Sequence, residues 1–294
     1  MDNRQLQIFH SVVKEGSFTR AANALHMAQP AVSIAIRKLE QELGQKLLSR
    51  AGKTILPTAE GERLLVHAQK ILQQFELAAQ EFVDLNNLHA GQVRLGTSAM
   101  LGSYYFPEKL TEFRRSHPGI NIRITGEGTQ RAQQLILTGE IDMGIVNMEG
   151  VPPNLQAHSL AVKEEVVACV GPKHRFAGKR SLSFESFAEE PLILYTEGYY
   201  LRELIASLSE HSDLQPRIAC ETNILRLMIN QVREGLGLGF CLRRVVEQEK
   251  DLVGVPFETP VFLDLGIAWK RNQYLSKANR QFVSFLLGKE LGEV

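Results

Sequence analysis

Apolar residues recur at helical spacing through residues 3–43, and residues that start or end helices divide them into three segments. The first apolar run covers residues 6–13, and Gly16 follows it as a helix-ending residue. Ser17 is a good N-cap for a second helix, and Pro30 suits the first turn of a third. Because only residues 26–28 separate the second helix from the third, the pattern predicts a helix-turn-helix.

The next segment predicts a small hairpin followed by a long helix. Residues 49–57 read as a hairpin or wing with Gly52 near its tip, and Thr58 caps the helix. A helix from Thr58 to Leu88 would span roughly 45 Å. Its apolar positions step alternately by four and three residues, as Leu64, Ala68, Ile71, Phe75, Ala78, Phe82 and Leu85. This heptad seam predicts pairing with a second copy of the chain, although a helix packed on its own domain would also carry an apolar stripe.

After residue 91 the hydrophobic period changes from that of helices to that of strands separated by helices. The candidate strands are residues 93–96, 120–124, 141–146, 166–170, 192–195 and 266–269. Strands that alternate with helical patterns predict parallel-type α/β layers. About 200 residues of this kind form one domain or two lobes.

Composition narrows the class of protein. The chain has 294 residues, of which 44% are hydrophobic, and no apolar run is long enough for a membrane-spanning helix. The N-terminus lacks the apolar core of a signal peptide, and three scattered cysteines make neither a disulfide framework nor a zinc site. We therefore expect a soluble, cytoplasmic protein without a metal or other cofactor.

The charge is unevenly distributed along the chain. Lys+Arg and Asp+Glu each number 33, but residues 1–60 carry eight Lys or Arg against five Asp or Glu, a net charge of +3. A modestly basic N-terminal module on a neutral-to-acidic body is compatible with DNA binding.

These N-terminal motifs resemble those of the LysR-type transcriptional regulators. The resemblance is dense in residues 16–22 (GSFTRAA), 29–33 (QPAVS), 39–44 (LEQELG), 47–50 (LLSR) and 56–61 (LPTAEG), and looser in residues 139–145 and 235–239. It implies a bacterial regulator, α/β overall, with an all-α winged helix-turn-helix domain, a long linker helix and a two-lobed α/β effector domain like a periplasmic binding protein. The implied boundaries are 1–58, 59–89 and 90–294, with lobe I at about 91–162 and 266–294 and lobe II at about 163–265.

The third helix carries the candidate base-reading residues. Gln29, Ser33 and Arg37 lie at i, i+4 and i+8, opposite the apolar stripe, so three polar side chains on one face can enter a major groove. A solvated helix face would show the same spacing. The full candidate DNA-binding set is Ser17, Thr19, Arg20, Gln29, Pro30, Ser33, Ile34, Arg37, Arg50 and Lys53.

Two positions depart from the family pattern. Ala28 stands where Ser or Thr is common, so the third helix lacks its usual capping hydroxyl, at a cost of about 1 kcal/mol. Ile34 stands where a basic or polar residue is common, and we hypothesise that it packs against a thymine methyl group.

Family positions for the effector map onto residues at the starts of helices and the ends of strands. Residues 97–103 precede a helix containing Pro107, and exposed N–H groups and hydroxyls there predict an anion cradle. Arg202 could reach a carboxylate, while Glu127, Glu197 and Glu221 at the rim leave open an amine-bearing or neutral ligand. The full candidate set is Thr97, Ser98, Met100, Gly128, Thr129, Asn147, Tyr195, Thr196, Arg202, Thr222 and Asn223.

The resemblance implies as partners double-stranded promoter DNA, a small-molecule effector, a second copy through the linker helix, a homotetramer, and RNA polymerase. An enzyme is the second hypothesis, but residues 235–239 lack the spacing of a nucleotide loop and no catalytic set stands out. A solute-binding protein is a third, opposed by the helix-turn-helix. Residues 195–210 hold no cysteine, which argues against a peroxide sensor.

Overall fold

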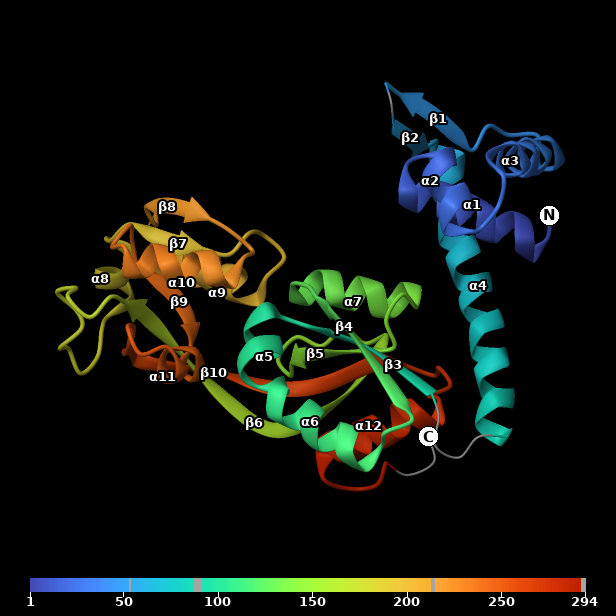
Figure 1. The fold of residues 1–294 in the computed structure, drawn as a ribbon. Helices are drawn as coiled ribbons and strands as arrows, with labels where there is room; N and C mark the ends of the chain where they lie inside the picture. Colours follow the sequence, from blue (N-terminus) through green and yellow to red (C-terminus); the bar gives the residue numbers. More distant parts are fainter. Residues whose placement is uncertain (53, 87–90, 213–214, 292–294) are drawn as a thin grey trace. The chain divides into compact units, whose positions relative to one another are not determined.

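The computed structural model describes residues 1–52, 54–86, 91–212 and 215–291 (Figure 1). The chain divides into two compact units, Met1–Asn86 and Asn87–Val294. Lys53 and residues 87–90, which include the expected linker boundary, lie outside the described residues.

The first unit consists of helices with a two-stranded wing. Its elements are α1 (Asn3–Glu15), α2 (Phe18–Ala24), α3 (Gln29–Leu43), β1 (Leu48–Ala51), β2 (Thr54–Pro57) and α4 (Ala59–Asn86). Gly16 ends α1 in the left-handed conformation, and Ser17 caps α2 through its side chain. The Thr58 hydroxyl accepts a hydrogen bond from the amide of Gly61 at 3.0 Å. The helix boundaries therefore follow the capping residues that the sequence predicts.

The first half of the long helix α4 packs against the core of its own unit. Ala68 is completely buried in the core of this unit, and Leu64 and Ile71 pack against that core. Phe75 and Phe82 are 55% and 67% exposed, and Ala78 is exposed too. The side chain of Leu85 lies outside the described residues. The first three seam positions therefore lie against the core of their own unit, where α1 packs on α4, and pairing of the seam with a second copy stays a prediction.

The second unit is built on a six-stranded sheet with the order β4-β3-β5-β10-β6-β9. The strands are β3 (Gly91–Thr97), β4 (Ile120–Gly126), β5 (Met143–Asn147), β6 (Leu155–Val170), β9 (Gly239–Leu242) and β10 (Val253–Lys270), with a separate parallel pair of β7 (Leu192–Leu194) and β8 (Ile218–Glu221). β3 is parallel to β4 and β5, as the sequence predicts. β10 is antiparallel to β5 and β6, and β6 to β9, so the expectation of parallel layers is wrong for this half. The cause is that the long strands β6 and β10 run between the two ends of the unit in opposite directions (Figure 1).

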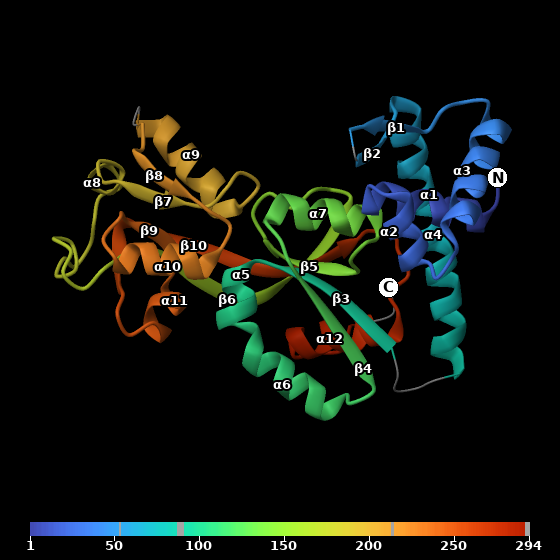
Figure 2. The same cartoon turned by 45° about the horizontal axis from the view of Figure 1, so that its top comes forward.

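Helices cover the two ends of the sheet and define two lobes (Figures 1 and 2). The first lobe contains β3–β5 with α5 (Ala99–Tyr104), α6 (Phe106–Ser116), α7 (Thr129–Thr138) and α12 (Lys277–Leu287). The second contains β7–β9 with α8 (Phe184–Ala188), α9 (Tyr200–Ser212), α10 (Leu225–Arg233) and α11 (Arg243–Gln248). In the first lobe α7 lies over one face of the sheet and α6 and α12 over the other.

The chain passes between the lobes within β6 and β10. The expected lobe boundaries, at residues 162 and 265, fall inside these strands. The pairing of β10 with β6 shifts register between Leu265 and Gly266, and Ala161 of β6 has a left-handed φ of 54°. A second register shift lies between Pro256 and Val261, and the strands pair on both sides of these irregularities, so the two lobes share one interrupted sheet.

Candidate functional site

The outer face of α3 presents the side chains that the helical spacing predicts. Gln29, Pro30 and Arg37 are exposed, and Ser33 is half-buried. The opposite stripe, Val32, Ile36 and Leu39, is buried in the core of the unit. Ala28 occupies the N-cap without a side-chain hydrogen bond. The burial of one stripe fixes the rotation of α3, and its polar side chains consequently face outward.

Ile34 lies in the middle of this polar face and is 63% exposed. A large aliphatic side chain left in water, on a helix whose stripe of Val32, Ile36 and Leu39 is buried, does not contribute to the core. Its position leaves it available for an apolar contact outside the chain.

A hollow separates α3 from the wing. It is lined by Phe18, Ser33, Ile36, Arg37, Glu40, Lys46, Leu48, Ser49, Arg50 and Ile55. The fold thus brings Arg37 of α3 and Arg50 of β1 to the same depression, as the sequence predicts for two residues of one surface. The remaining predicted wing residue, Lys53, lies outside the described residues.

Glu40 is a residue of this region that sequence reasoning missed. Its carboxylate accepts hydrogen bonds from the amides of Leu47 at 2.9 Å and Leu48 at 3.4 Å, and from Lys46 Nζ at 2.7 Å. Burial acts to raise the pKa of Glu40, but these hydrogen bonds outweigh it and lower the pKa below the ordinary value. Glu40 therefore ties the end of α3 to the start of the wing. A glutamate on the buried stripe of a helix was the available signal.

Two of the DNA-binding candidates at the start of α2, Ser17 and Arg20, make local hydrogen bonds. The Ser17 hydroxyl accepts from the Arg20 amide at 3.4 Å, so it caps the helix. Arg20 Nε donates to the Glu15 carbonyl at 3.0 Å, although the side chain of Arg20 stays exposed, as does Thr19. Thr19 and Arg20 remain accessible, whereas the Ser17 hydroxyl has a structural role.

In the second unit a cleft lies between the two lobes. Its lining residues are Ser98, Met100, Leu101, Glu127, Thr129, Ile145, Val146, Asn147, Tyr195, Tyr199, Tyr200, Leu201, Leu242, Leu263 and Leu265. The space between these atoms, its opening to solvent included, is about 580 Å³. Ser98, Met100, Thr129, Asn147 and Tyr195 were predicted from the sequence.

Six predicted effector residues do not line this cleft, namely Thr97, Gly128, Thr196, Arg202, Thr222 and Asn223. Arg202 is engaged in an ion pair with Glu221 at 3.1 Å, which removes both from the expected rim. The Thr222 hydroxyl accepts from the Ile224 amide at 3.0 Å, as a turn residue does. The Thr97 hydroxyl is completely buried at the end of β3.

At Gly128 the two lobes approach each other closely. A Cβ atom added there would lie 2.5 Å from the carbonyl oxygen of Gly198 in the second lobe. That carbonyl also accepts a hydrogen bond from the Gln130 amide at 3.3 Å. Gly128 thus permits the contact between α7 and the Gly198 loop instead of binding a ligand.

The expected anion cradle after β3 is wrong in its geometry. Residues 99–103, expected as part of a loop, lie in the short helix α5, and the Ser98 hydroxyl caps it by accepting from the Leu101 amide at 3.3 Å. Among the described lining residues there is no Lys, Arg or His, and Glu127 is the one charged side chain.

The tyrosines form the polar part of the cleft. The rings of Tyr195 and Tyr199 stack with centroids 5.3 Å apart. The Tyr195 hydroxyl is buried without a hydrogen-bond partner among the described residues, and burial raises its pKa well above the ordinary value. Burial also raises the pKa of Tyr199 and Tyr200, next to Glu127 and Glu149 respectively. Sequence reasoning missed Tyr200 and Leu201, and the signal was a tyrosine pair directly after a glycine turn.

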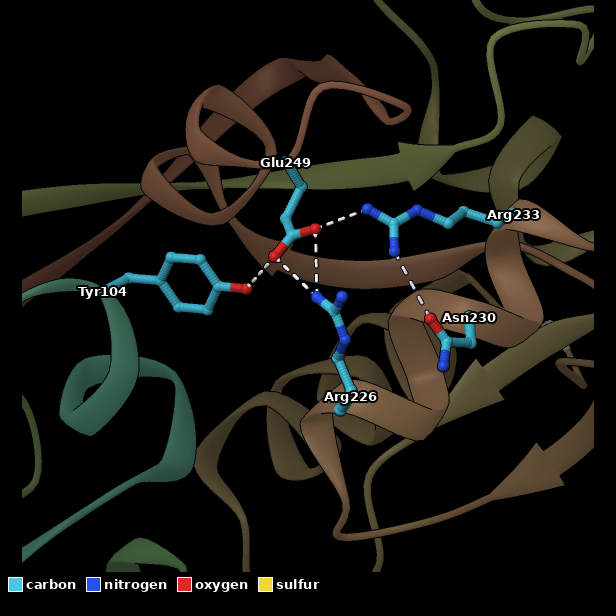
Figure 3. A network of polar contacts seen from close by, with 5 residues as sticks. All are labelled: Tyr104, Arg226, Asn230, Arg233 and Glu249. Atoms are coloured by element: carbon cyan, nitrogen blue, oxygen red, sulfur yellow. Dashed lines mark hydrogen bonds and ion pairs between the residues drawn. The ribbon is translucent and has the colours of Figure 1, made fainter.

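A polar network joins the lobes beside the cleft (Figure 3). Glu249, after α11, accepts hydrogen bonds from the Tyr104 hydroxyl of α5 at 2.6 Å and from Arg226 and Arg233 of α10 at 3.0 and 2.5 Å. Burial, with a smaller contribution from Glu249, raises the pKa of Tyr104 to about 12. Tyr104 belongs to the first lobe, whereas Glu249, Arg226 and Arg233 belong to the second, so the hydrogen bond from Tyr104 to Glu249 joins the lobes.

Two family descriptions cover most of the chain. The LysR substrate binding domain matches residues 86–290, and the bacterial regulatory helix-turn-helix protein, lysR family, matches residues 3–62. An uncharacterized HTH-type transcriptional regulator of Bacillus subtilis (strain 168) is 31% identical over 287 residues, 96% of this chain and 95% of that protein.

Solved structures resemble the chain over nearly its whole length. HinK, a LysR family transcriptional regulator from Pseudomonas aeruginosa, matches with a TM-score of 0.60 and 26% identity, covering 98% of this chain and 97% of that one. Full-length CbnR complexed with its target DNA matches with a TM-score of 0.70 and 20% identity, covering 97% and 99%.

Metal-binding clusters and membrane-spanning helices are both absent from the described residues. No cluster of three or more His, Cys, Asp or Glu side chains there could hold a metal ion. In the same residues, no helix is both long and apolar enough to cross a membrane.

Proposed function

Since these matches show that the chain belongs to the LysR family of transcriptional regulators, we propose that it reads promoter DNA with the outer face of α3 and responds to a small molecule held between the lobes of its second unit. It is a transcriptional regulator and not an enzyme. The observation that carries the DNA-binding proposal is the exposure of Gln29, Ile34 and Arg37 on one face of a helix whose opposite stripe is buried.

Each residue of this face has a chemical role in the proposal. The amide of Gln29 pairs with an adenine edge, and the guanidinium of Arg37 pairs with guanine or holds a phosphate. Ser33 reaches a base or a phosphate, while Arg50 on the wing and Arg20 on α2 neutralise the DNA backbone. The solved complex of full-length CbnR with its target DNA supports this use of the fold.

The effector acts through the two lobes. A molecule in the cleft touches α5, α7 and β5 of the first lobe and the Tyr195–Leu201 segment of the second. It shifts the regulator only by as much as it prefers one arrangement of the lobes over another. The effector is the one small molecule that regulation needs in this proposal, which includes no cofactor.

The assembly uses the exposed half of α4. Phe75, Ala78 and Phe82 are the described seam positions left for a second copy, and we propose that they form a homodimer that pairs into a tetramer on DNA. We further propose that the regulator contacts RNA polymerase and is located in the cytoplasm.

The decisive experiment measures DNA binding by the full-length chain and its Arg37→Ala variant. A duplex selected from a random pool by the wild-type protein serves as the probe, and fluorescence anisotropy gives Kd at several salt concentrations. We expect Arg37→Ala to weaken binding by about 1–3 kcal/mol, or roughly tenfold to a hundredfold. Wild-type binding should also fall steeply with salt because phosphate contacts release counterions.

Arg131→Ala is the matched control, since Arg131 is an exposed arginine on α7 of the second unit. It should bind the selected duplex like the wild type. Equal affinities for all three proteins, or binding without salt dependence, would show that the α3 face does not read DNA.

A further inference from the structure

The charges around the interlobe cleft indicate which class of effector fits it. Glu127 is the one charged side chain among the described lining residues, and its carboxylate makes no hydrogen bond or ion pair to a described residue. The arginines of α9 and α10 are engaged elsewhere, Arg202 with Glu221 and Arg226 and Arg233 with Glu249. An anionic ligand would therefore enter beside an uncompensated negative charge, with no lining cation to balance it.

The helix starts at the cleft already make hydrogen bonds within the chain. Ser98 already caps α5 with its own hydroxyl. At the start of α7 the Gln130 amide donates to the Gly198 carbonyl of the opposite lobe. One amide at each of these two helix starts is thus already bonded to an oxygen of the chain.

Aromatic and apolar surfaces complete the cleft. The stacked rings of Tyr195 and Tyr199 stand beside Tyr200, and the negative face of an aromatic ring attracts cations. The remaining wall is aliphatic and consists of Met100, Leu101, Ile145, Val146, Leu201, Leu242, Leu263 and Leu265. The same site therefore offers a carboxylate and ring faces to a cation, and a hydrocarbon surface to an apolar body.

A buried hydroxyl provides independent evidence for a ligand. Tyr195 is 5% exposed, lines the cleft, and has no hydrogen-bond partner for its hydroxyl among the described residues. A buried polar group without a partner is costly, and a polar group of a ligand removes that cost. The Tyr195 side chain lies in the wall of the cleft next to the buried Cys241 and Cys169, so this wall holds a polar group without a partner among the described residues.

We propose that the effector is a protonated amine with a compact apolar body, whose ammonium group lies beside Glu127 and the tyrosine rings and whose hydrocarbon part lies against the leucine-rich wall. This assignment rests on the proposed effector site and names the class of molecule that fills it.

Three probes of similar size test the assignment on the full-length protein: 2-phenylethylamine, 2-phenylethanol and phenylacetate. Isothermal titration calorimetry at neutral pH gives Kd for each. We expect the amine to bind at least about tenfold more tightly than phenylacetate, with the alcohol between them. Glu127→Gln should reduce the affinity for the amine to that for the alcohol and leave the alcohol unchanged. Tyr195→Phe should weaken both by a similar factor.

Glu258→Gln is the matched control, because Glu258 is exposed and does not line the cleft. It should preserve the order of affinities. Tightest binding of phenylacetate, an amine preference that survives in Glu127→Gln, or no binding of any probe at about 10 mM would overturn the amine assignment. Salt-dependent binding to the selected duplex by both wild type and Glu127→Gln would leave the DNA-binding proposal standing in each of those cases, whereas its loss in the wild type would refute the regulator mechanism itself.

Discussion

The DNA-binding face of α3 and the interlobe cleft differ in how far apart their residues lie along the chain. The face consists of residues 29–37, which one helix presents to solvent. The cleft draws residues from six segments between Ser98 and Leu265, brought together by a sheet whose strand order is not the chain order. The first site needs only a correctly rotated helix, whereas the second exists only after both lobes have folded and met.

The two sites also differ in chemistry. The α3 face is open, polar and basic, and each of its side chains can be replaced without exposing a core. The cleft is enclosed by tyrosines and aliphatic residues around a single carboxylate. Substitutions that disturb the support of one site should therefore leave the other unchanged, and three predictions test this independence.

The largest effect is expected from Glu40→Gln, which removes the charge that holds the wing to α3. The amides of Leu47 and Leu48 would lose a charged acceptor in a buried position. Lys46 is 79% exposed, so its pair with Glu40 adds little. We expect the amides of Leu47 and Leu48 to exchange with solvent about 30-fold faster, which corresponds to about 2 kcal/mol, by hydrogen exchange of the full-length protein. Ligand binding in the cleft should not change.

A control variant and a change of pH test whether the charge of Glu40 protects these amides. Glu42→Gln, an exposed glutamate on the same helix, should leave the exchange of both amides as it is. Since the pKa of Glu40 is lowered from its ordinary value of 4.5, its contribution is fully present above that pH and is lost as pH falls through the lower folded value. The wild type and Glu40→Gln should therefore converge at acidic pH. Equal exchange rates at neutral pH would contradict the role given to Glu40.

A smaller effect is expected from Tyr104→Phe, which removes the bond between the first lobe and Glu249. Glu249 keeps Arg226 and Arg233 as partners, so no charge is left unpaired and the loss is about 1 kcal/mol. For a unit of about 200 residues this lowers Tm by roughly 2–4 °C, which scanning calorimetry of the full-length protein detects. DNA affinity should stay the same.

Tyr105→Phe is the control for this change. Tyr105 is the next residue, and its hydroxyl makes no hydrogen bond to a described residue. An equal drop in Tm for both variants would mean that lost packing, not the bond to Glu249, is responsible.

The contrast between a face formed by one helix and a cleft formed by distant segments explains which features the sequence could predict. Gly16, Ser17 and Pro30 act within a few residues of their own position, so the boundaries of α1–α3 and the orientation of the α3 face follow from local patterns. Ser98 was placed in the cleft by the resemblance to the family, while its role as a helix cap is a local one.

The rest depends on pairing between distant segments. Leu263 and Leu265 reach the cleft because β10 starts at Val253, whereas the sequence predicted a strand only from residue 266. Glu40 gains its role from amides seven and eight residues further on, across a turn. Arg202 was expected in the cleft, but its position in the fold places it next to Glu221. No periodicity along the chain predicts these contacts between distant residues.

Ile34→Arg is expected to change stability least of the three substitutions. It should alter only which DNA sequence the protein prefers. Ile34 is 63% exposed and packs into no core, so its replacement should alter the free energy of unfolding by less than about 0.5 kcal/mol. If Ile34 contacts a thymine methyl group, its loss removes the apolar contact, and arginine at the same place favours guanine. Selection from a random duplex pool with wild type and variant should then give motifs that differ at one base pair, with cleft binding unchanged. Identical motifs would show that the side chain at position 34 does not touch a base, and would confine readout on this face to Gln29, Ser33 and Arg37.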